Sequence, residues 1–152
     1  MSKVVFLDTG VLGFITHPAA DRSRPCVEWL AGLIDSGVRV CFVEVCDYEL
    51  RRKLLHIESA DAIAKLDTLK DIIDFVPIGS PAMTRAAELR ADARRRGQAA
   101  AADDALDGDV IQVAQALLSV AEQDEVVIAT DNVGHLGNFV SAQRYEDIAA
   151  DE

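Results

Sequence analysis

The chain has 152 residues, of which half are hydrophobic and 27% are charged, and its formal net charge is −11. This composition is typical of a globular protein and excludes a largely disordered chain. The negative charge disfavours a general nucleic-acid-binding surface, because affinity for phosphates comes mainly from Lys and Arg. At this length we expect residues 1–152 to form a single domain.

The sequence predicts neither a membrane segment nor a signal peptide. No apolar run approaches the length of a membrane span, and Asp8 interrupts the apolar stretch near the N-terminus. The cysteines Cys26, Cys41 and Cys46 stand in apolar surroundings, which favours free core thiols in a reducing cytoplasm. Zinc binding by Cys41 and Cys46 is disfavoured, since no second Cys or His pair stands at a metal-ligand spacing.

The first predicted strand, Val4–Leu7, is a short apolar run that ends at Asp8. A helix is predicted in "DRSRPCVEWLAGLIDSG", where apolar residues recur at helical spacing and Gly37 stands at the expected C-terminal cap. The second predicted strand, Val38–Val43, leads into a helix in "DYELRRKLLHI". The apolar stripe of that helix is predicted to consist of Leu50, Leu54 and Ile57.

The middle of the chain continues this alternation of helices and strands. A helical pattern in "SADAIAKLDTLKDII" precedes the third predicted strand, Phe75–Ile78. Ser80 and Pro81 predict the next helix start, with a capping hydroxyl and a proline in the first turn. That helix is expected to end at Gly97.

The last third of the chain contains one more helix and strand pair. The alanine-rich stretch "GQAAAADDALDG" is interpreted as a mobile loop or a helix start. It precedes a helix in "GDVIQVAQALLSVA", whose apolar face is predicted to carry Val110, Val113, Ala114 and Leu117. A strand is predicted at Val126–Ala129 and a weaker one near Tyr145–Ile148.

Strands that alternate with helices imply crossover connections and a parallel sheet covered on both faces. The predicted fold is therefore α/β, a three-layer sandwich with a central, mostly parallel sheet of four to five strands. Sheets of this kind bind ligands at the carboxyl ends of their strands, where the strand order reverses.

Acidic residues stand where such a site is expected. Asp8 follows the first strand and Asp131 follows the strand Val126–Ala129, so both belong at the same sheet edge. Glu49 lies in the helix after the second strand, near that edge, and Asp109 is expected in the first turn of its helix. Four carboxylates in one cleft repel one another unless a cation neutralises them, and hard oxygen ligands suit Mg²⁺ or Mn²⁺.

Glu49 also has a simpler interpretation. Lys53 follows it by four residues, and Glu before Lys at this spacing forms a weakly stabilising helix pair. Glu44, nearer the strand end, is the alternative to Glu49.

The third acid is ambiguous, because Asp104 and Asp107 stand close to Asp109. Asp107 is interpreted as the N-cap of the helix, and Asp109 could merely complement the helix dipole. We favour Asp109 as the ligand, with Asp104 and Asp107 left open as replacements.

Four segments, in this order, resemble one known family. The segments "VVFLDTGVL", "DYELRRKLL", "DGDVIQVAQAL" and "VVIATDNVGHL" are similar to the motifs of PIN domains, the nuclease fold found in toxins of the VapC kind. The resemblance spans nearly the whole chain. The acidic positions of that family correspond here to Asp8, Glu49, Asp109 and Asp131.

The resemblance implies a metal-dependent endoribonuclease, the toxin of a toxin–antitoxin pair. In that role Asp8 and Asp109 are expected to hold the principal Mg²⁺ or Mn²⁺, Asp131 to complete or orient that shell, and Glu49 to position the attacking water. Thr9, Thr130 and Asn132 are expected to orient the carboxylates. Contacts to RNA phosphates are expected from Arg51, Arg52, Arg94, Arg95 and Arg96.

The expected partners are an RNA substrate, an antitoxin that inserts Arg or Lys into the acidic cleft, and a second copy of the chain in a homodimer. The alternative is a PIN-like module without nuclease activity that binds RNA or protein.

Other reactions of α/β proteins fit the residues less well. A phosphatase of the haloacid-dehalogenase type needs a second Asp at the position of Gly10, and a response-receiver domain needs paired acids and a late lysine. The turn "DTGVLGF" does not match a dinucleotide-binding glycine pattern. His17, His56 and His135 stand singly, for which solvated or structural roles are expected.

Overall fold

The computed structural model describes residues 2–97 and 103–149, except for the side chains of residues 103–106. In the first half of the chain the elements are β1 (Lys3–Leu7), α1 (Thr9–Thr16), α2 (Ala20–Asp35), β2 (Arg39–Val43), α3 (Glu44–His56) and α4 (Ala60–Leu69). In the second half they are β3 (Asp74–Val76), α5 (Ser80–Arg95), α6 (Asp103–Leu118), β4 (Glu125–Ala129), α7 (Val133–Leu136), β5 (Ser141–Gln143) and the 3₁₀ helix η1 (Tyr145–Asp147).

The strands form one sheet in the order β3-β2-β1-β4-β5, and each neighbouring pair is parallel. The central strand β1 pairs with β2 on one side, where Val5 lies opposite Val40, and with β4 on the other, where Val5 lies opposite Val127. The chain builds outward from β1 to β3 and then returns to the other side of β1. The strand order therefore reverses between β1 and β4, which is where such sheets bind ligands.

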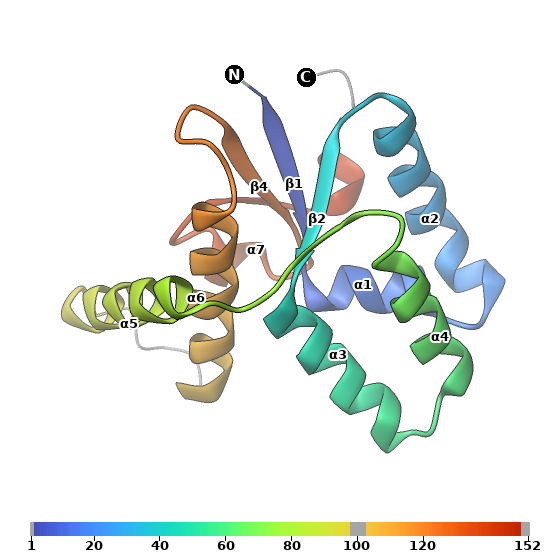
Figure 1. Cartoon of the computed structure of the whole chain (residues 1–152), viewed down its shortest axis with the longest axis horizontal. Helices are drawn as coiled ribbons and strands as arrows, with labels where there is room; N and C mark the ends of the chain where they lie inside the picture. Colours follow the sequence, from blue (N-terminus) through green and yellow to red (C-terminus); the bar gives the residue numbers. More distant parts are fainter. Residues whose placement is uncertain (1, 98–102, 150–152) are drawn as a thin grey trace.

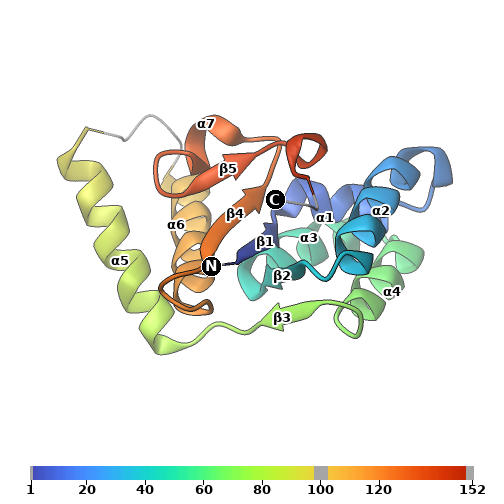
Figure 2. The ribbon, with the colours of Figure 1, turned by 90° about the horizontal axis from the view of Figure 1, so that it is seen from above.

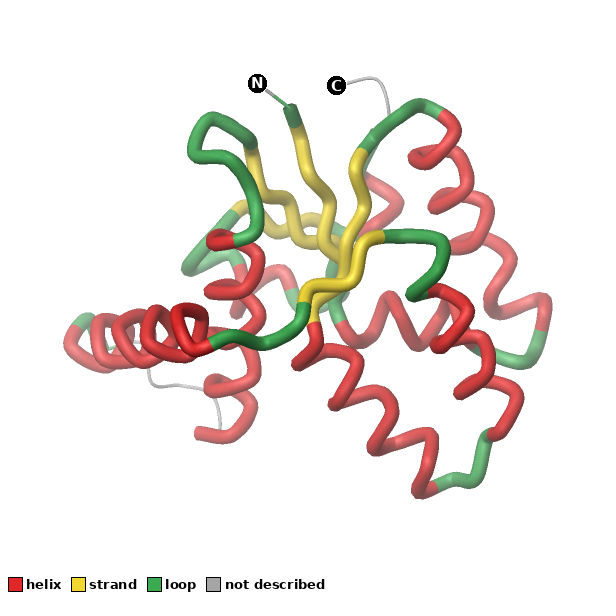
Figure 3. Tube along the Cα trace, viewed as in Figure 1, coloured by secondary structure: helices red, strands yellow, loops and turns green. Residues whose placement is uncertain are grey.

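Helices cover the sheet on both faces, as a parallel sheet requires. Figure 1 shows α2 and α4 on one side of the strands, and α5 and α6 on the other. The strands occupy the middle of the molecule between these helices (Figure 3). The prediction of an α/β fold with a central parallel sheet is confirmed.

The sheet supplies the centre of the core. Val4 to Leu7 of β1 are all at most 2% exposed, and Val40 to Val43 of β2 are also buried. Continuous burial of this kind, without alternation, is the pattern of a parallel strand that packs helices on both faces. The helix α2 ends as predicted, because Gly37 adopts a positive φ of 81° and its N–H donates to the carbonyl of Ile34, 3.0 Å away.

The fifth strand differs from the prediction. Tyr145–Ile148 does not form a strand, since Tyr145–Asp147 is a 3₁₀ helix, and the edge strand is Ser141–Gln143. The three residues of β5 lack β-branched side chains, so their extended form comes from pairing with β4. Tyr145 packs its ring edge-on against Trp29, with ring centroids 5.3 Å apart. A tertiary contact of this kind leaves no periodicity in the sequence.

Two local predictions about helices are also wrong. Ile57 is 66% exposed, because α3 ends at His56 and Ile57 is already its C-terminal cap. Ser80 does not cap α5, since the N-cap is Gly79 and Ser80 is the first helical residue. Pro81 does stand in the first turn of α5, where its missing N–H costs nothing.

The start of α6 lies earlier than predicted. The helix begins at Asp103, so Asp109 lies in its second turn and Asp107 is not its N-cap. The part of the alanine-rich stretch from 98 to 102 lies outside the described residues. Because Asp109 is inside the helix, the dipole of a first turn does not account for its position.

No helix in the described ranges is long and apolar enough to cross a bilayer. Cys26, Cys41 and Cys46 are buried and free, as predicted for core thiols.

Candidate active site

Asp8 lies at the point where the strand order reverses, directly after β1. Its backbone N–H donates to the carbonyl of Ala129 at the end of β4, 3.0 Å away. Its Oδ2 accepts a hydrogen bond from the Thr130 hydroxyl at 2.6 Å, and its Oδ1 accepts from the Thr9 N–H at 2.8 Å, which caps α1. The carboxylate is thereby fixed between the ends of β1 and β4.

Glu49 reaches the same place from α3. The Thr9 hydroxyl donates to its Oε1 at 2.8 Å. Its Oε2 lies against α6, because a Cβ added to Gly108 would stand only 2.8 Å from that oxygen. Both oxygens of Glu49 are therefore directed at α1 and α6 rather than at Lys53, which is exposed.

Asp109 enters from α6, and its carboxylate is largely buried. The side chain is 18% exposed, and its Oδ2 is a buried atom without a hydrogen-bond partner among the residues that the structure describes. The pKa of Asp109 is raised to about 6, chiefly by burial and then by the charge of Asp8, with a smaller contribution from Glu49, while His135 opposes the rise. The carboxylates of Asp8 and Glu49 therefore interact electrostatically with that of Asp109.

Asp131 lies at the same sheet edge but is exposed to solvent. Its Oδ2 lies 3.9 Å from the position that a Cβ on Gly10 of α1 would take. Its charge also acts on Cys26 of α2, because burial and then the charge of Asp131 raise the pKa of that thiol to about 12. Asp131 is therefore turned toward α1 and α2, at the outer side of the site.

The predicted supporting residues surround the acids. Thr9 and Thr130 donate to Glu49 and Asp8, as described above. The Asn132 N–H donates to the Thr130 hydroxyl oxygen at 2.8 Å, which orients the Thr130 proton toward Asp8. The Asn132 amide Nδ2 also lies 3.0 Å from Nδ1 of His135. A chain of hydrogen bonds therefore runs from His135 of α7 through Asn132 and Thr130 to Asp8.

The alternative acids have other partners. Glu44 accepts a hydrogen bond from the Ile78 N–H at 2.8 Å, and Asp107 pairs with Arg90 across α5 and α6 at 3.1 Å. The side chain of Asp104 lies outside the described residues. Of the two acids of α6 whose side chains are described, Asp109 is the one whose pKa is raised by the charges of Asp8 and Glu49.

The predicted RNA-binding arginines occupy two different settings. Arg51 forms an ion pair with Asp47 of the same helix at 3.0 Å and one with Asp67 at 2.7 Å, which joins α3 to α4. Arg52 is exposed on α3. The three consecutive arginines Arg94–Arg96 are exposed at the end of α5.

Two residues of the site were missed from the sequence. Gly108 stands inside a helix, and an isolated glycine in a helical pattern is a signal of close packing that could have identified it. His135 was expected to be structural or solvated, but its Nδ1 lies 3.9 Å from Asp109 Oδ2. Its contact depends on how α7 meets α6, for which the sequence carries no local signal.

The described residues contain no group of three or more His, Cys, Asp or Glu side chains already arranged to hold a metal ion. Mg²⁺, however, is usually bound by one or two carboxylates and keeps several waters. Asp8 and Asp109 fit that smaller requirement, since Asp109 Oδ2 is buried and accepts no hydrogen bond from any described residue.

Comparison with known proteins gives matches at the level of structure. No family model matches the sequence, and no curated protein matches it either. A chain of the VapBC2 structure from Rickettsia felis, bound to a promoter DNA fragment, is similar with a TM-score of 0.68 and 14% identity, over 93% of this chain and 98% of that one. VapBC-1 of nontypeable Haemophilus influenzae gives a TM-score of 0.66 at 14% identity, over 95% and 99% of the two chains.

DNA-bound VapBC from Salmonella typhimurium is also similar, with a TM-score of 0.56 and 16% identity over 95% of this chain and 99% of that one. At such low identity the likeness establishes the fold. The chain therefore has a PIN-like α/β fold, as chains of these VapBC complexes do.

Proposed function

We propose that the protein is a divalent-metal-dependent endoribonuclease. The observation that carries the proposal is the buried Oδ2 of Asp109, which has no hydrogen-bond partner among the described residues and interacts electrostatically with the carboxylates of Asp8 and Glu49. An arrangement of this kind is unfavourable for folding, because like charges and burial both penalise the ionised form. A bound cation removes that penalty. Since the acids do not stabilise the fold by themselves, their arrangement indicates a functional site.

The donor set suits Mg²⁺ or Mn²⁺. Carboxylate oxygens are hard ligands, and the cysteine nearest the site, Cys46, is completely buried. Burial raises the pKa of the Cys46 thiol well above its usual range, so it is not a thiolate ligand. Asp8 and Asp109 are the residues that would hold the ion. When bound, such an ion activates water and stabilises charge on a phosphodiester.

Each residue of the candidate site has a separate task in this proposal. Thr130 fixes the rotamer of Asp8, because its hydroxyl donates to Oδ2. Glu49 is held by Thr9 and positions the attacking water. Asp131, on the outer side, completes or orients the shell around the ion. Asn132 fixes the direction of the Thr130 hydroxyl.

The substrate and partners are proposed on the same basis. RNA phosphates would contact Arg52 and Arg94–Arg96, whose side chains are exposed, while Arg51 would need to leave its pairs with Asp47 and Asp67. The structural neighbours are VapBC complexes, which favours an antitoxin partner that presents Arg or Lys to the acids. A toxin role and a homodimer, both implied by the family resemblance, are part of the proposal.

The test is Mn²⁺-dependent cleavage of single-stranded and structured RNA by the purified protein. Cleavage is expected for the wild type and for Asp71→Asn, an exposed control, and it should be lost in Asp8→Asn and Asp131→Asn. If both of these variants cleave like the wild type, the proposal is wrong. RNA binding by the wild type without any cleavage would instead favour the alternative, a PIN-like binding module without nuclease activity.

A further inference from the structure

The helix α5 packs mainly on a single neighbour, α6. It lies at one end of the molecule, beyond α6, as seen from above (Figure 2). Its contact with α6 uses small side chains, and the buried members of this contact form a cluster separate from the main core: Ala82, Ala86, Val110 and Ala114. Because these side chains are short, an open space remains between the two helices, bordered by the longer side chains that stand next to them.

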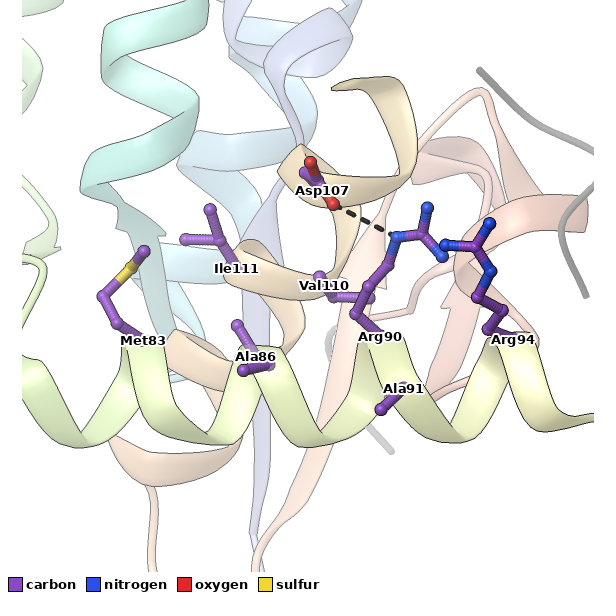
Figure 4. Close-up of a pocket in the computed structure, with 9 residues that line it drawn as sticks. Met83, Ala86, Arg90, Ala91, Arg94, Asp107, Val110 and Ile111 are labelled. Carbon is purple, nitrogen blue, oxygen red and sulfur yellow. Dashed lines mark hydrogen bonds and ion pairs between the residues drawn. The ribbon is translucent and has the colours of Figure 1, made fainter. Parts of the chain in front are cut away.

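That space is a cavity of about 550 Å³ between α5 and α6. Its lining is apolar at one end, where Met83 and Ile111 lie, and charged at the other, where Arg90 and Arg94 lie with Asp107 (Figure 4). Figure 4 shows both arginines extending from the same face of α5, one turn apart, with Arg90 bonded to Asp107 of α6. The volume is in the range of small-molecule sites, about 300–1,000 Å³.

The charge around this cavity is unlike that of the rest of the chain. The segment from Ser80 to Arg96 carries five arginines and two acids, in a chain of net charge −11. By contrast, a cavity of about 390 Å³ beside β4 is lined by Glu122, Asp124 and Glu125. A phosphate-bearing ligand is therefore attracted to α5 and repelled from the cavity beside β4.

The cavity lies close to the acids of the candidate active site. Asp107, at its edge, precedes Asp109 by two residues on α6, so their side chains leave the helix on opposite faces. The two sites are therefore separated by roughly the width of one helix, about 10–12 Å. One RNA strand can reach both.

We propose that this cavity binds one unstacked nucleotide of a single-stranded RNA whose neighbouring phosphate lies at the acidic site. The inference rests on the proposed function, because it takes the ligand to be the substrate of the Asp8 and Asp109 site. The base packs on Met83, Val110 and Ile111, and Arg94 contacts the phosphate. Arg94 suits this role, since its side chain is exposed and it forms no ion pair with any residue in the described ranges.

The geometry selects single-stranded RNA. A base enters a cavity only after it leaves its stack, and unpaired loops and ends allow this at the lowest cost. Apolar contact with the base face tolerates every base, so the cavity is expected to give little sequence preference.

The experiment measures the affinity of a fluorescein-labelled, single-stranded RNA oligonucleotide by anisotropy, in an Asp8→Asn background that prevents turnover. Arg94→Ala is expected to weaken binding about five-fold at 0.1 M salt, and to lower the slope of log affinity against log salt by about 0.7. Arg24→Ala is the matched control, since Arg24 is also exposed on a helix but lies on α2. It should leave both values unchanged.

A second pair of variants tests the cavity itself. Ala87 lines the cavity and is exposed, so larger side chains there leave the core intact. Ala87→Glu and Ala87→Gln have nearly the same size, and the Glu variant is expected to bind RNA about five-fold more weakly than the Gln variant. In proteins with an intact Asp8, Arg94→Ala should raise KM for RNA and leave kcat unchanged.

The inference is overturned if Arg94→Ala and Arg24→Ala give the same affinity and salt slope, or if the Ala87 variants change only the oligomeric state in sedimentation. The proposed function fails separately, if the wild type does not cleave RNA with Mn²⁺. Lack of any RNA binding by the wild-type protein would overturn both.

Discussion

The acidic site and the arginine-bearing helix α5 are built in opposite ways. In the acidic site two carboxylates are fixed by hydrogen bonds from neighbouring side chains, Asp8 by Thr130 and Glu49 by Thr9, and Asp109 is held in a largely buried position. The arginines at the end of α5 are exposed and are carried by a helix that packs on α6 through alanines. The difference indicates that one region sets the position of reacting atoms, whereas the other supplies attraction without strict geometry.

Burial explains why interactions between charges should be stronger in the acidic site than on α5. Charges in a largely buried site interact strongly, because little water screens them, whereas exposed ion pairs contribute about 1 kcal/mol or less. Substitutions among the acids are therefore expected to have large effects and substitutions among the arginines small ones.

The largest effect is expected for Asp109→Asn in RNA cleavage. Loss of a carboxylate that holds the metal ion should lower kcat by about 10³-fold, since the ion contributes several kcal/mol to the barrier. The matched variant Asp107→Asn, whose carboxylate pairs with Arg90 on the opposite face of α6, should retain kcat within about tenfold. Equal losses in the two variants would show that Asp109 has no special role.

The next largest effect is expected for Gly108→Ala. The new Cβ would stand 2.8 Å from Oε2 of Glu49, so that Glu49 must move away from the site. We expect a loss of about 10–100-fold in cleavage, the usual cost of disturbing a residue that supports a metal site. Gly32→Ala is the control, since a Cβ there meets nothing within 4 Å. If both alanine variants cleave like the wild type, the close packing of Glu49 on α6 is irrelevant to the reaction.

The third prediction concerns the stability of Asp109→Asn without metal. The folded protein raises the pKa of this carboxyl from 3.8 to about 6, so the native state binds a proton more tightly than the unfolded state. The free energy of unfolding of the wild type should therefore fall as the pH rises from 4 to 7, and the variant should lack this fall. At pH 7 the variant is expected to be more stable by about 2 kcal/mol.

Urea unfolding in EDTA at pH 4 and pH 7 measures this difference. The advantage of the variant should nearly disappear at pH 4, where the carboxyl is protonated in the folded wild type. A variant that is less stable than the wild type at pH 7 would argue against a strained carboxylate at this position.

The smallest effect is expected in α5. Arg95 pairs with Asp92 on an exposed face, and its replacement by Ala should change the free energy of unfolding by less than about 0.5 kcal/mol. The same urea experiment at pH 7 measures it. A loss of more than 2 kcal/mol would mean that α5 is held by its charges, and the contrast between the two regions would fail.

Much of the fold could be predicted because its elements leave local patterns. The buried strands β1, β2 and β4 are continuous apolar runs, and Gly37 stands where α2 needs a positive φ. The meeting of Asp8 with the end of β4 follows from the sheet itself, since parallel strands end at one edge.

The remaining features depend on tertiary contacts. Gly108 matters only because α3 brings Glu49 against α6, and the outward direction of Asp131 depends on α1. The first residue of α6 could not be predicted from the sequence, because a stretch rich in alanine favours a helix without marking where it begins. The strand β5 exists through its pairing with β4.

The most direct test of the metal site is the effect of Mn²⁺ on unfolding at pH 7. At an Mn²⁺ concentration about 100 times Kd, the wild type should gain about 2.7 kcal/mol in the free energy of unfolding, because only the folded state binds the ion. Asp8→Asn and Asp109→Asn should gain much less, while Asp71→Asn should behave like the wild type. Equal stabilisation of all four proteins, or none in the wild type, would contradict a cation site at these carboxylates.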